Sequence, residues 1–333
     1  MNNGTNCAMT SGMASGMTSH QPPRLSVIIP TYNRAATLAR CLAALGAQSC
    51  APEDFEIIVA DDGSSDHSAE VVATWAAKLR CALRWLHQPN AGANRARNRA
   101  IGMARGELLL LINDDTIAVP QMLAEHLATH RQYPDDRVAV LGRMTVSPEV
   151  PHSRLAPLHL DRAFVGLQGG AELDWRAFFT CNVSLKKTLL ERGGLFEERI
   201  RYHEDLELAW RLSAQGLRVV YRPQALGWHE HCLQEDEFLS IAEREARALC
   251  TWWQISPAAR PVLASLGYEP ALPWARRARH RVFDLLLSRT AEPLWRRLAR
   301  GLPDRFNRAS LALYDQLYQS RKRAALRALL KPQ

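Results

Sequence analysis

Two carboxylates at the end of a strongly apolar run are the first candidates for chemistry. Residues 108–112 are all aliphatic, and Asn113, Asp114 and Asp115 follow directly. Such a run is typical of a strand that is buried on both faces of a parallel sheet. Two adjacent buried carboxylates are costly unless a cation or strong hydrogen-bond donors meet them. The sequence therefore predicts that this strand delivers acid to the floor of an active site.

A second acidic pair, Glu204 and Asp205, precedes an apolar spacing typical of a helix. Leu208 and Leu212 lie on one face of that helix, so the pair falls in its first turn. The helix dipole favours ionised carboxylates there, and an ionised carboxylate at neutral pH can act as a general base. Ordinary helix-start chemistry is the alternative.

Two histidines, His229 and His231, are candidates for metal ligation. An imidazole beside a carboxylate favours Mn²⁺ over Mg²⁺, which prefers oxygen ligands alone. A single H-x-H is not a specific metal signature, and a histidine pair in an interfacial loop is the alternative. The seven cysteines are scattered without a CxxC pair, which argues against a disulfide framework or a structural zinc site.

The elements that must position these groups alternate along the first half of the chain. Apolar runs at 25–30, 55–60, 83–87 and 108–112 predict strands, and helical spacing follows each of them. This order indicates an α/β fold with a mostly parallel central sheet. Polar residues follow three of these strands at the carboxyl ends, where open α/β sheets bind ligands. They are Thr31, Tyr32 and Arg34, then Asp61 and Asp62, and then residues 113–115.

The middle of the chain is less regular. Residues 147–170 are rich in proline and glycine and predict a loop or lid over the site. Strands are expected at 178–185 and 218–221, with a short helix between them that ends at Gly193 and Gly194. Asn182 lies in the first of these strands. No G-x-G-x-x-G follows the first strand and no P-loop motif occurs. The sequence therefore lacks the main evidence for an ordinary dinucleotide-binding protein or a P-loop protein.

Several motifs, taken in order, resemble those of an inverting family 2 glycosyltransferase with a GT-A fold. They occupy residues 26–34, 61–64, 96–98, 113–115, 193–198 and 204–205, within a resemblance that covers about 24–232. The resemblance implies a nucleotide-sugar donor, with a UDP-sugar as the first choice, and a divalent metal, Mn²⁺ or Mg²⁺. It also implies an acceptor hydroxyl on a saccharide or a lipid-linked molecule, as in cell-envelope or polysaccharide biosynthesis.

The resemblance also implies roles for individual residues. Pro30, Thr31, Tyr32 and Arg34 would lie along the nucleotide, Asp62 with Asp61 would accept hydrogen bonds from the base, and Arg97 would approach the base or phosphates. Asn113 departs from the usual carboxylate and would contact the ribose as an amide, while Asp114 belongs to the donor site. Asp115 and His229, with His231 as the alternate, would bind the metal. Asp205 would be the base, and Glu204 would orient the acceptor or a loop. Asn182 would face the donor sugar or the acceptor, or else would be a buried amide that serves a neighbouring loop.

The chain divides into three expected parts. Residues 1–24 lack a basic start and an apolar core and predict a disordered leader, 25–234 the catalytic domain, and 235–333 a basic helical region. From residue 271 onward, fifteen Lys and Arg stand against four Asp and Glu, so this tail carries +11 and the remainder −3. Its arginines alternate with Trp, Phe and Leu, which suits the surface of an anionic membrane. A helical appendage packed on the catalytic domain, with a solvated basic face, is the alternative.

No apolar run reaches the ~20 residues of a membrane-spanning helix. We therefore expect a cytoplasmic protein, peripheral at the inner face of the membrane if the tail binds there. Two other functions compete with glycosyl transfer. A catalytically silent sugar-nucleotide-binding or membrane-docked assembly protein would keep the fold, but the intact Asp115 and Asp205 argue against it. A nucleotidyltransferase would carry a glycine-rich basic loop after the first strand, and residues 31–34 do not form one.

Nucleic acid is not an expected partner. Arg95, Arg97 and Arg99 recur on one short segment, but no aromatic residues are interleaved with them. A solvated basic helix face is the other interpretation of this segment.

Overall fold

The computed structural model describes residues 21–151, 153–158 and 160–330. Most of the expected leader, residues 1–20, lies outside this range. The centre of the molecule is a nine-stranded sheet in the order β3-β2-β1-β4-β8-β6-β9-β5, with β7 paired to β9. Its strands are β1 (Leu25–Thr31), β2 (Phe55–Asp61), β3 (Ala82–His87), β4 (Leu108–Ile112), β5 (Thr116–Ala118), β6 (Val138–Val146), β7 (Glu172–Leu173), β8 (Asn182–Lys186) and β9 (Arg218–His229).

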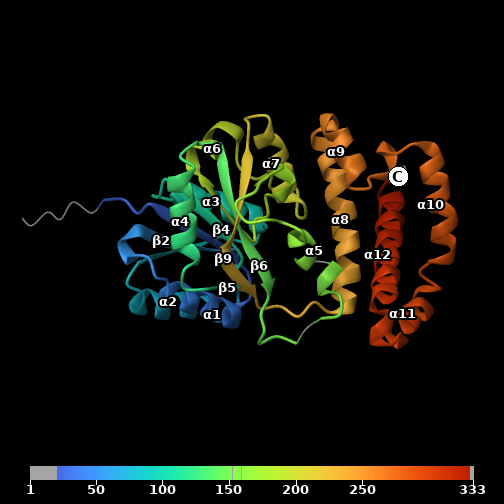
Figure 1. Ribbon diagram of the computed structural model, residues 1–333, viewed down its shortest axis with the longest axis horizontal. Helices are drawn as coiled ribbons and strands as arrows, with labels where there is room; N and C mark the ends of the chain where they lie inside the picture. The colour runs from blue at the N-terminus through green and yellow to red at the C-terminus, as the bar shows by residue number, and fades with distance from the viewer. Residues whose placement is uncertain (1–20, 152, 159, 331–333) are drawn as a thin grey trace, which may run out of the picture.

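One half of the sheet is parallel, and every residue of β1, β2 and β4 is buried. Helices cover both faces of this half (Figure 1). They are α1 (Ala35–Gly46), α2 (Ser68–Lys78), α3 (Ala93–Met103) and α4 (Met122–Gln132). Continuous aliphatic strands suit this position because neither face meets water. The α/β fold with a parallel strand group, as predicted, is confirmed.

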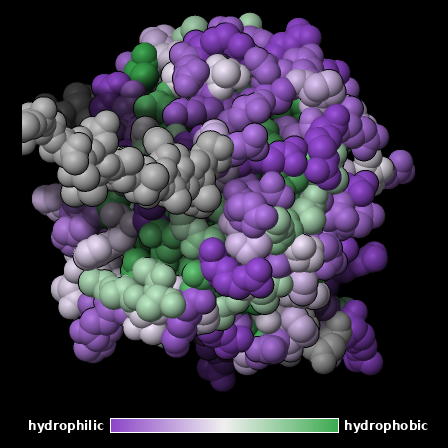
Figure 2. All heavy atoms as spheres, turned by 90° about the vertical axis from the view of Figure 1, so that its left-hand side faces the viewer, coloured by the Kyte–Doolittle hydropathy of each residue, from purple (hydrophilic) through white to green (hydrophobic). Residues whose placement is uncertain are grey.

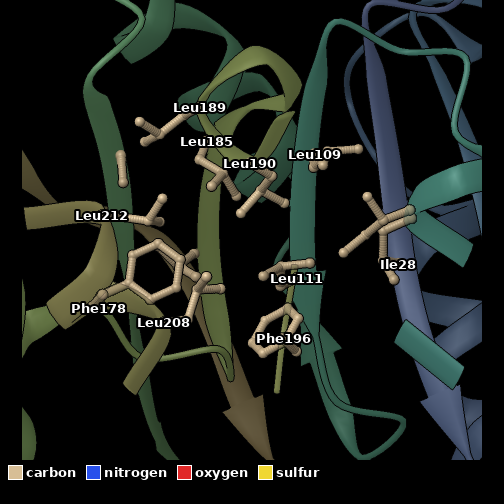
Figure 3. Close-up of a cluster of buried hydrophobic side chains, with 14 of the residues drawn as sticks. Ile28, Leu109, Leu111, Phe178, Leu185, Leu189, Leu190, Phe196, Leu208 and Leu212 are labelled. Carbon is tan, nitrogen blue, oxygen red and sulfur yellow. The ribbon is translucent and has the colours of Figure 1, made fainter. Parts of the chain in front are cut away.

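The other half of the sheet is mixed. Strand β8 lies antiparallel between β4 and β6, whereas β6 pairs with β9 in parallel. Helices α5 (Leu160–Phe164), α6 (Lys187–Gly193) and α7 (Glu204–Ser213) belong to this half. A shared apolar core joins the halves: Ile28 of β1 and Leu111 of β4 point toward the same space as Leu208 of α7 (Figure 3).

The sequence-based boundaries need two corrections in this half. The expected strand at 178–185 begins only at Asn182, because Phe178 packs fully buried in the core after a short 3-10 turn, Trp175–Ala177. The expected strand at 218–221 runs on through His229, since β9 pairs with both β6 and β5. The predicted lid at 147–170 contains α5 and a 3-10 turn, Ala156–Leu158.

The C-terminal region is entirely helical. It comprises α8 (Glu235–Ile255), α9 (Arg260–Ser265), α10 (Trp274–Leu286), α11 (Glu292–Gly301) and α12 (Asn307–Leu329). Helix α8 packs on the catalytic domain, with Trp252 fully buried beside Trp210 of α7. Helix α12 lies against α8, and α10 is the outermost element (Figure 1). In the part of the chain that the structure describes, no helix is both long and apolar enough to cross a membrane.

Candidate active site

Three adjoining cavities open where the parallel strands end. The strand-end cavity, about 270 Å³, is lined by Pro30, Thr31, Tyr32, Arg34, Asp62, Ala93, Arg97, Asn113 and Asp114. The histidine cavity, about 410 Å³, contains Arg34, Asp115, His229 and His231. The helix-start cavity, about 370 Å³, contains Arg97, Asn113, Glu204, Asp205 and His229. Because Arg34, Arg97, Asn113 and His229 each line two of these cavities, the three cavities adjoin one another around residues 113–115.

The buried carboxylates of Asp114 and Asp115 are bridged by one guanidinium. Arg34 donates from Nη1 to Asp114 Oδ1 at 2.8 Å and from Nη2 to Asp115 Oδ2 at 2.7 Å. The Thr31 hydroxyl donates to the other oxygen of Asp114 at 2.7 Å. Burial raises the pKa of Asp114 to about 6, against the opposing charge of Arg34. The cation that the sequence analysis required at this strand end is supplied by the chain itself.

The second strand end separates the roles of Asp61 and Asp62. Asp61 lines none of the three cavities; its oxygens face the backbone N–H of Ser64 at 2.9 Å and the His87 ring at 3.0 Å. Asp62 lines the strand-end cavity and accepts from Gln88, from the backbone of Ala91 and from that of Gly92. Asp62 Oδ2 accepts only one of these bonds, which leaves it acceptor capacity toward the cavity. The expectation that Asp61 contacts a base stays a prediction, and Asp62 is the better placed of the two because it lines the strand-end cavity.

Arg97 is buried between two cavities, while Arg95 and Arg99 on the same helix are exposed. Its Nη1 donates to Asn94 Oδ1 at 2.8 Å and lies 3.3 Å from Glu204 Oε1. Its Nε is buried without a hydrogen-bond partner. A solvated helix face is thus excluded for Arg97, which joins the strand-end cavity to the first turn of α7.

The two predicted histidines differ in their surroundings. His229 Nε2 lies 3.4 Å from Asp115 Oδ2, and burial lowers the pKa of His229 although Asp115 opposes this. A neutral imidazole is the form that binds metal. His231 Nε2 instead faces Glu237 Oε2 at 2.7 Å. This geometry favours His229 over His231 beside Asp115.

The donor set around Asp115 fits a metal only in part. Among the described residues, no group of three or more His, Cys, Asp and Glu side chains is gathered closely enough to hold a metal ion. However, Asp115 Oδ1 is buried without a hydrogen-bond partner, and His229 faces the same carboxylate. One carboxylate and one imidazole fit a site whose other ligands come from a bound molecule or water.

Asp205 lies in the first turn of α7, in the helix-start cavity. Its Oδ1 accepts from the backbone N–H of Leu206 at 2.8 Å. Burial and then Glu204 raise the pKa of Asp205 to about 6, while His203 and Arg97 oppose the rise. We expected the helix dipole to keep Asp205 ionised, but burial has the larger effect on its pKa. A pKa of about 6 leaves Asp205 mainly ionised at pH 7 and makes it a stronger base than an exposed aspartate.

Asn182 does not face any of the three cavities. Its Nδ2 donates to the carbonyls of Arg143 at 3.1 Å and Ala225 at 2.8 Å, and its Oδ1 lies 2.9 Å from His126 Nε2. With no exposed surface, Asn182 has no group left for a sugar or an acceptor. The alternative interpretation, a buried amide that fixes neighbouring segments, is correct.

Two residues that line the helix-start cavity were not singled out from the sequence. Tyr202 and His203 directly precede the acidic pair, and their rings lie 4.6 Å apart, centroid to centroid. Their position next to Glu204 and Asp205 in the sequence is the feature from which they could have been predicted. Leu160 and Phe164 of α5 also line this cavity, so the predicted lid does border the site.

Comparisons with known proteins agree with this geometry. The model of the family described as Glycosyl transferase family 2 matches residues 26–191. Validoxylamine A glucosyltransferase of Streptomyces hygroscopicus subsp. limoneus is 33% identical over an alignment of 240 residues that covers 64% of this chain and 52% of that protein. The chain spans about half the length of the curated relatives that it matches first.

Two solved structures share the fold. The mannosyltransferase PcManGT from Pyrobaculum calidifontis, in complex with GDP-Man and Mn²⁺, has a TM-score of 0.65 at 19% identity and covers 93% of this chain and 89% of its own. TarS 1–349 of S. aureus, in complex with UDP, has a TM-score of 0.54 at 18% identity and covers 92% of this chain and 91% of its own. At these identities the likeness concerns the fold.

Proposed function

This chain belongs to glycosyl transferase family 2, and from that premise we propose that it is a metal-dependent, inverting glycosyltransferase. It transfers a sugar from a nucleoside diphosphate sugar to a hydroxyl of a saccharide or lipid-linked acceptor. The observation that carries the proposal is the adjacency of the three cavities, whose shared lining residues place Asp115 and Asp205 on neighbouring sides of one strand-end region. The fold neighbours include one with GDP-Man and one with UDP, so both nucleotides belong in its test.

The nucleotide lies in the strand-end cavity. Tyr32, which is 48% exposed, offers a ring surface to the base, and Asp62 Oδ2 retains acceptor capacity for it. Asn113 reaches the ribose, and Arg34 can turn from the two carboxylates toward the diphosphate because its side chain is 37% exposed. Asp115 and His229 are the residues that would hold Mn²⁺ or Mg²⁺, and the ion would neutralise the departing nucleoside diphosphate.

The acceptor hydroxyl lies in the helix-start cavity next to Asp205. As the hydroxyl oxygen attacks the anomeric carbon, Asp205 takes its proton. Burial tunes this carboxylate to a pKa of about 6, which is close to neutral pH and suits a general base. Glu204 accepts a hydrogen bond from Arg97, which lines the strand-end cavity. This contact connects the first turn of α7, where Asp205 lies, to the nucleotide.

The decisive experiment is a panel of UDP- and GDP-sugars with Mn²⁺, read as released nucleoside diphosphate. In Asp205→Asn we expect turnover to fall by about 10²–10⁴-fold while donor affinity is kept, since only the proton acceptor is lost. Asp174→Asn is the matched control, because Asp174 caps the exposed turn at Trp175–Ala177 and lines none of the three cavities. Wild-type turnover in Asp205→Asn would remove the mechanism. Donor binding without any release would favour the silent sugar-nucleotide-binding protein.

The proposal includes an anionic membrane surface as a partner, with the protein at its cytoplasmic face. No residue of α10 is buried, and Trp274, Val282 and Leu285 are 75%, 63% and 78% exposed. Their spacing places them along one side of the helix, with the exposed Arg281 among them. An apolar stripe with arginines suits the interface of an anionic bilayer. The opposite end of the molecule presents mainly hydrophilic residues (Figure 2).

A further inference from the structure

A buried network of charged and polar groups joins the C-terminal helices to the start of α7. Glu245 of α8 accepts at Oε1 from His203 Nε2 at 2.9 Å and from Lys322 Nζ of α12 at 3.2 Å. Its Oε2 accepts from the Tyr318 hydroxyl of α12 at 2.6 Å. The side chains of Glu245 and Lys322 are 7% and 5% exposed. A buried ion pair depends on satisfied geometry, so these groups fix one another's positions.

The residue that receives this contact has an unusual backbone. His203 has φ +59° and ψ +20°, in the left-handed region, and it is the N-cap of α7. Among the described residues other than glycine, only Asn33 and His203 have positive φ, and both lie beside the cavities. Such a conformation costs about 1 kcal/mol or more outside glycine and persists only where the surroundings hold it. For His203 the surroundings are Glu245 and the ring of Tyr202.

We propose that Glu245 is a positioning residue for the transfer reaction: it holds His203 and thereby fixes the turn that carries Glu204 and Asp205. The inference rests on the proposed function, in which Asp205 is the base. It makes the C-terminal helices a structural part of the catalytic site, in addition to any membrane contact. This contact could not be predicted from sequence motifs, because about forty residues separate His203 from Glu245.

The network also carries a charge effect that an ordinary structural contact would lack. Asp205 is faced by Glu204 and His203 of its own segment, by Arg97 of α3, and more distantly by Tyr202 and Cys181. The charge of His203 lowers the pKa of Asp205, and the contact with Glu245 holds His203 in that position. Glutamine at position 245 weakens this contact, so the pKa of Asp205 should rise as His203 moves away.

The test compares Glu245→Gln with wild type, using a donor identified in the sugar-nucleotide panel. We expect kcat to fall at least tenfold with the KM for the donor unchanged, and the acidic limb of the pH profile to move upward. Glu292→Gln is the matched control: Glu292 is equally buried and pairs with Arg321 at 2.6 Å, but the pair joins only α11 and α12. Glu292→Gln should keep kcat within twofold. Glu245→Asp, which keeps the carboxylate, should recover part of the shift in the pH profile.

Circular dichroism and donor binding establish that each variant is folded. If Glu245→Gln does not fold, Tyr318→Phe removes one hydrogen bond to Glu245 and should lower kcat in the same direction by less. Wild-type kcat and pH profile in folded Glu245→Gln would overturn the inference, as would equal losses in Glu245→Gln and Glu292→Gln. If the wild-type chain transfers no sugar at all, the proposed function itself fails. The two failures are therefore distinguishable.

Discussion

At the residue scale, Arg34 is the internal counter-charge of the site. It bridges Asp114 and Asp115, whose side chains are each 5% exposed. These are the two carboxylates that directly follow the end of β4. If a metal replaced the Arg34 guanidinium beside these carboxylates when the donor binds, Arg34 would be free to turn toward the diphosphate. Arg34 then serves two states of the enzyme, one without donor and one with it.

This dual role predicts that metal can replace Arg34. In Arg34→Met, two buried carboxylates lose their cation, and the free energy of unfolding should fall by about 2 kcal/mol, below the 3–5 kcal/mol of fully buried pairs because Arg34 is partly exposed. Mn²⁺ at about a hundred times its Kd should add about 2.7 kcal/mol, enough to offset this loss. Urea denaturation with and without Mn²⁺ measures both effects.

The control for this prediction is Arg176→Met. Arg176 pairs with Asp174, and the two side chains are 54% and 56% exposed, so its loss should cost at most about 1 kcal/mol. Equal losses in the two variants, or no recovery of Arg34→Met with Mn²⁺, would contradict the metal-replacement argument.

A second prediction at this scale concerns the pH dependence of transfer. Asp205 must be ionised to accept a proton, and its pKa is raised to about 6. The kcat/KM should therefore fall about tenfold per pH unit below about pH 6, about two units above the limb that an unperturbed aspartate would give. Rates measured from pH 5 to 8 at fixed Mn²⁺ test this. Rates that stay constant from pH 8 down to pH 5 would show that Asp205 is not the base.

The same scale shows how far the sequence could predict the site. Residues 113–115 and the residues after β1 were placed correctly at one edge, because parallel strands bring their carboxyl ends together. Asn182 was not, since its partners in β6, α4 and β9 are distant in sequence, and no local pattern reveals whether a buried amide is already satisfied. His203 was missed for the same reason, as its partner Glu245 lies in another region.

At the element scale, the parallel strands were predictable and the mixed half was not. Strands β1, β2 and β4 begin and end within one residue of their apolar runs, because burial on both faces demands continuous aliphatic residues. Strand β6 was not predicted, although it is the longest pairing partner of β9. Its neighbours β8 and β9 follow it by several dozen residues, and such non-local pairing leaves little trace in a single segment.

The contact between α8 and α7 predicts a pH-dependent stability. Burial alone would raise the pKa of Glu245, but His203 and Lys322 prevail and lower it from 4.5 to about 2. A carboxylate with a lowered pKa stabilises the fold above its unfolded pKa and loses that contribution as the pH falls through its folded pKa. The difference corresponds to about 3 kcal/mol.

Urea denaturation of wild type and Glu245→Gln should therefore show a constant difference between pH 7 and 5. This difference should shrink as the pH falls from about 4.5 toward about 2, where the wild-type carboxyl becomes protonated. Glu292→Gln shares the helical region but not the contact with His203. A difference for Glu245→Gln that does not change with pH would mean that its charge does not stabilise the fold.

At the scale of the whole molecule, the two interpretations of the basic tail apply to different helices. Helices α8 and α12 are packed: Trp252 is fully buried, and Lys322 and Tyr318 enter the network at Glu245. For α8 and α12 the packed appendage is therefore the interpretation that fits. Helix α10 has no buried residue, and α11 joins the core through Ala299 while its Leu294 and Leu298 are 59% and 49% exposed. A truncation near residue 270 would remove α12 as well, so single substitutions are the sharper probe.

The last prediction is that α10 binds anionic bilayers through Leu285 and its neighbours. Burying these side chains in the interface contributes about 1.5–3 kcal/mol each, and nearby arginines about 1 kcal/mol each. Leu285→Asp should therefore weaken binding to phosphatidylserine-containing liposomes at least tenfold, and about 0.5 M salt should weaken wild-type binding. Flotation of the full-length protein measures both. Val165→Asp is the matched control, because Val165 is 77% exposed on the catalytic domain and should bind like wild type. Equal flotation of Leu285→Asp and wild type, or equal binding to neutral liposomes, would exclude α10 as the anionic docking surface.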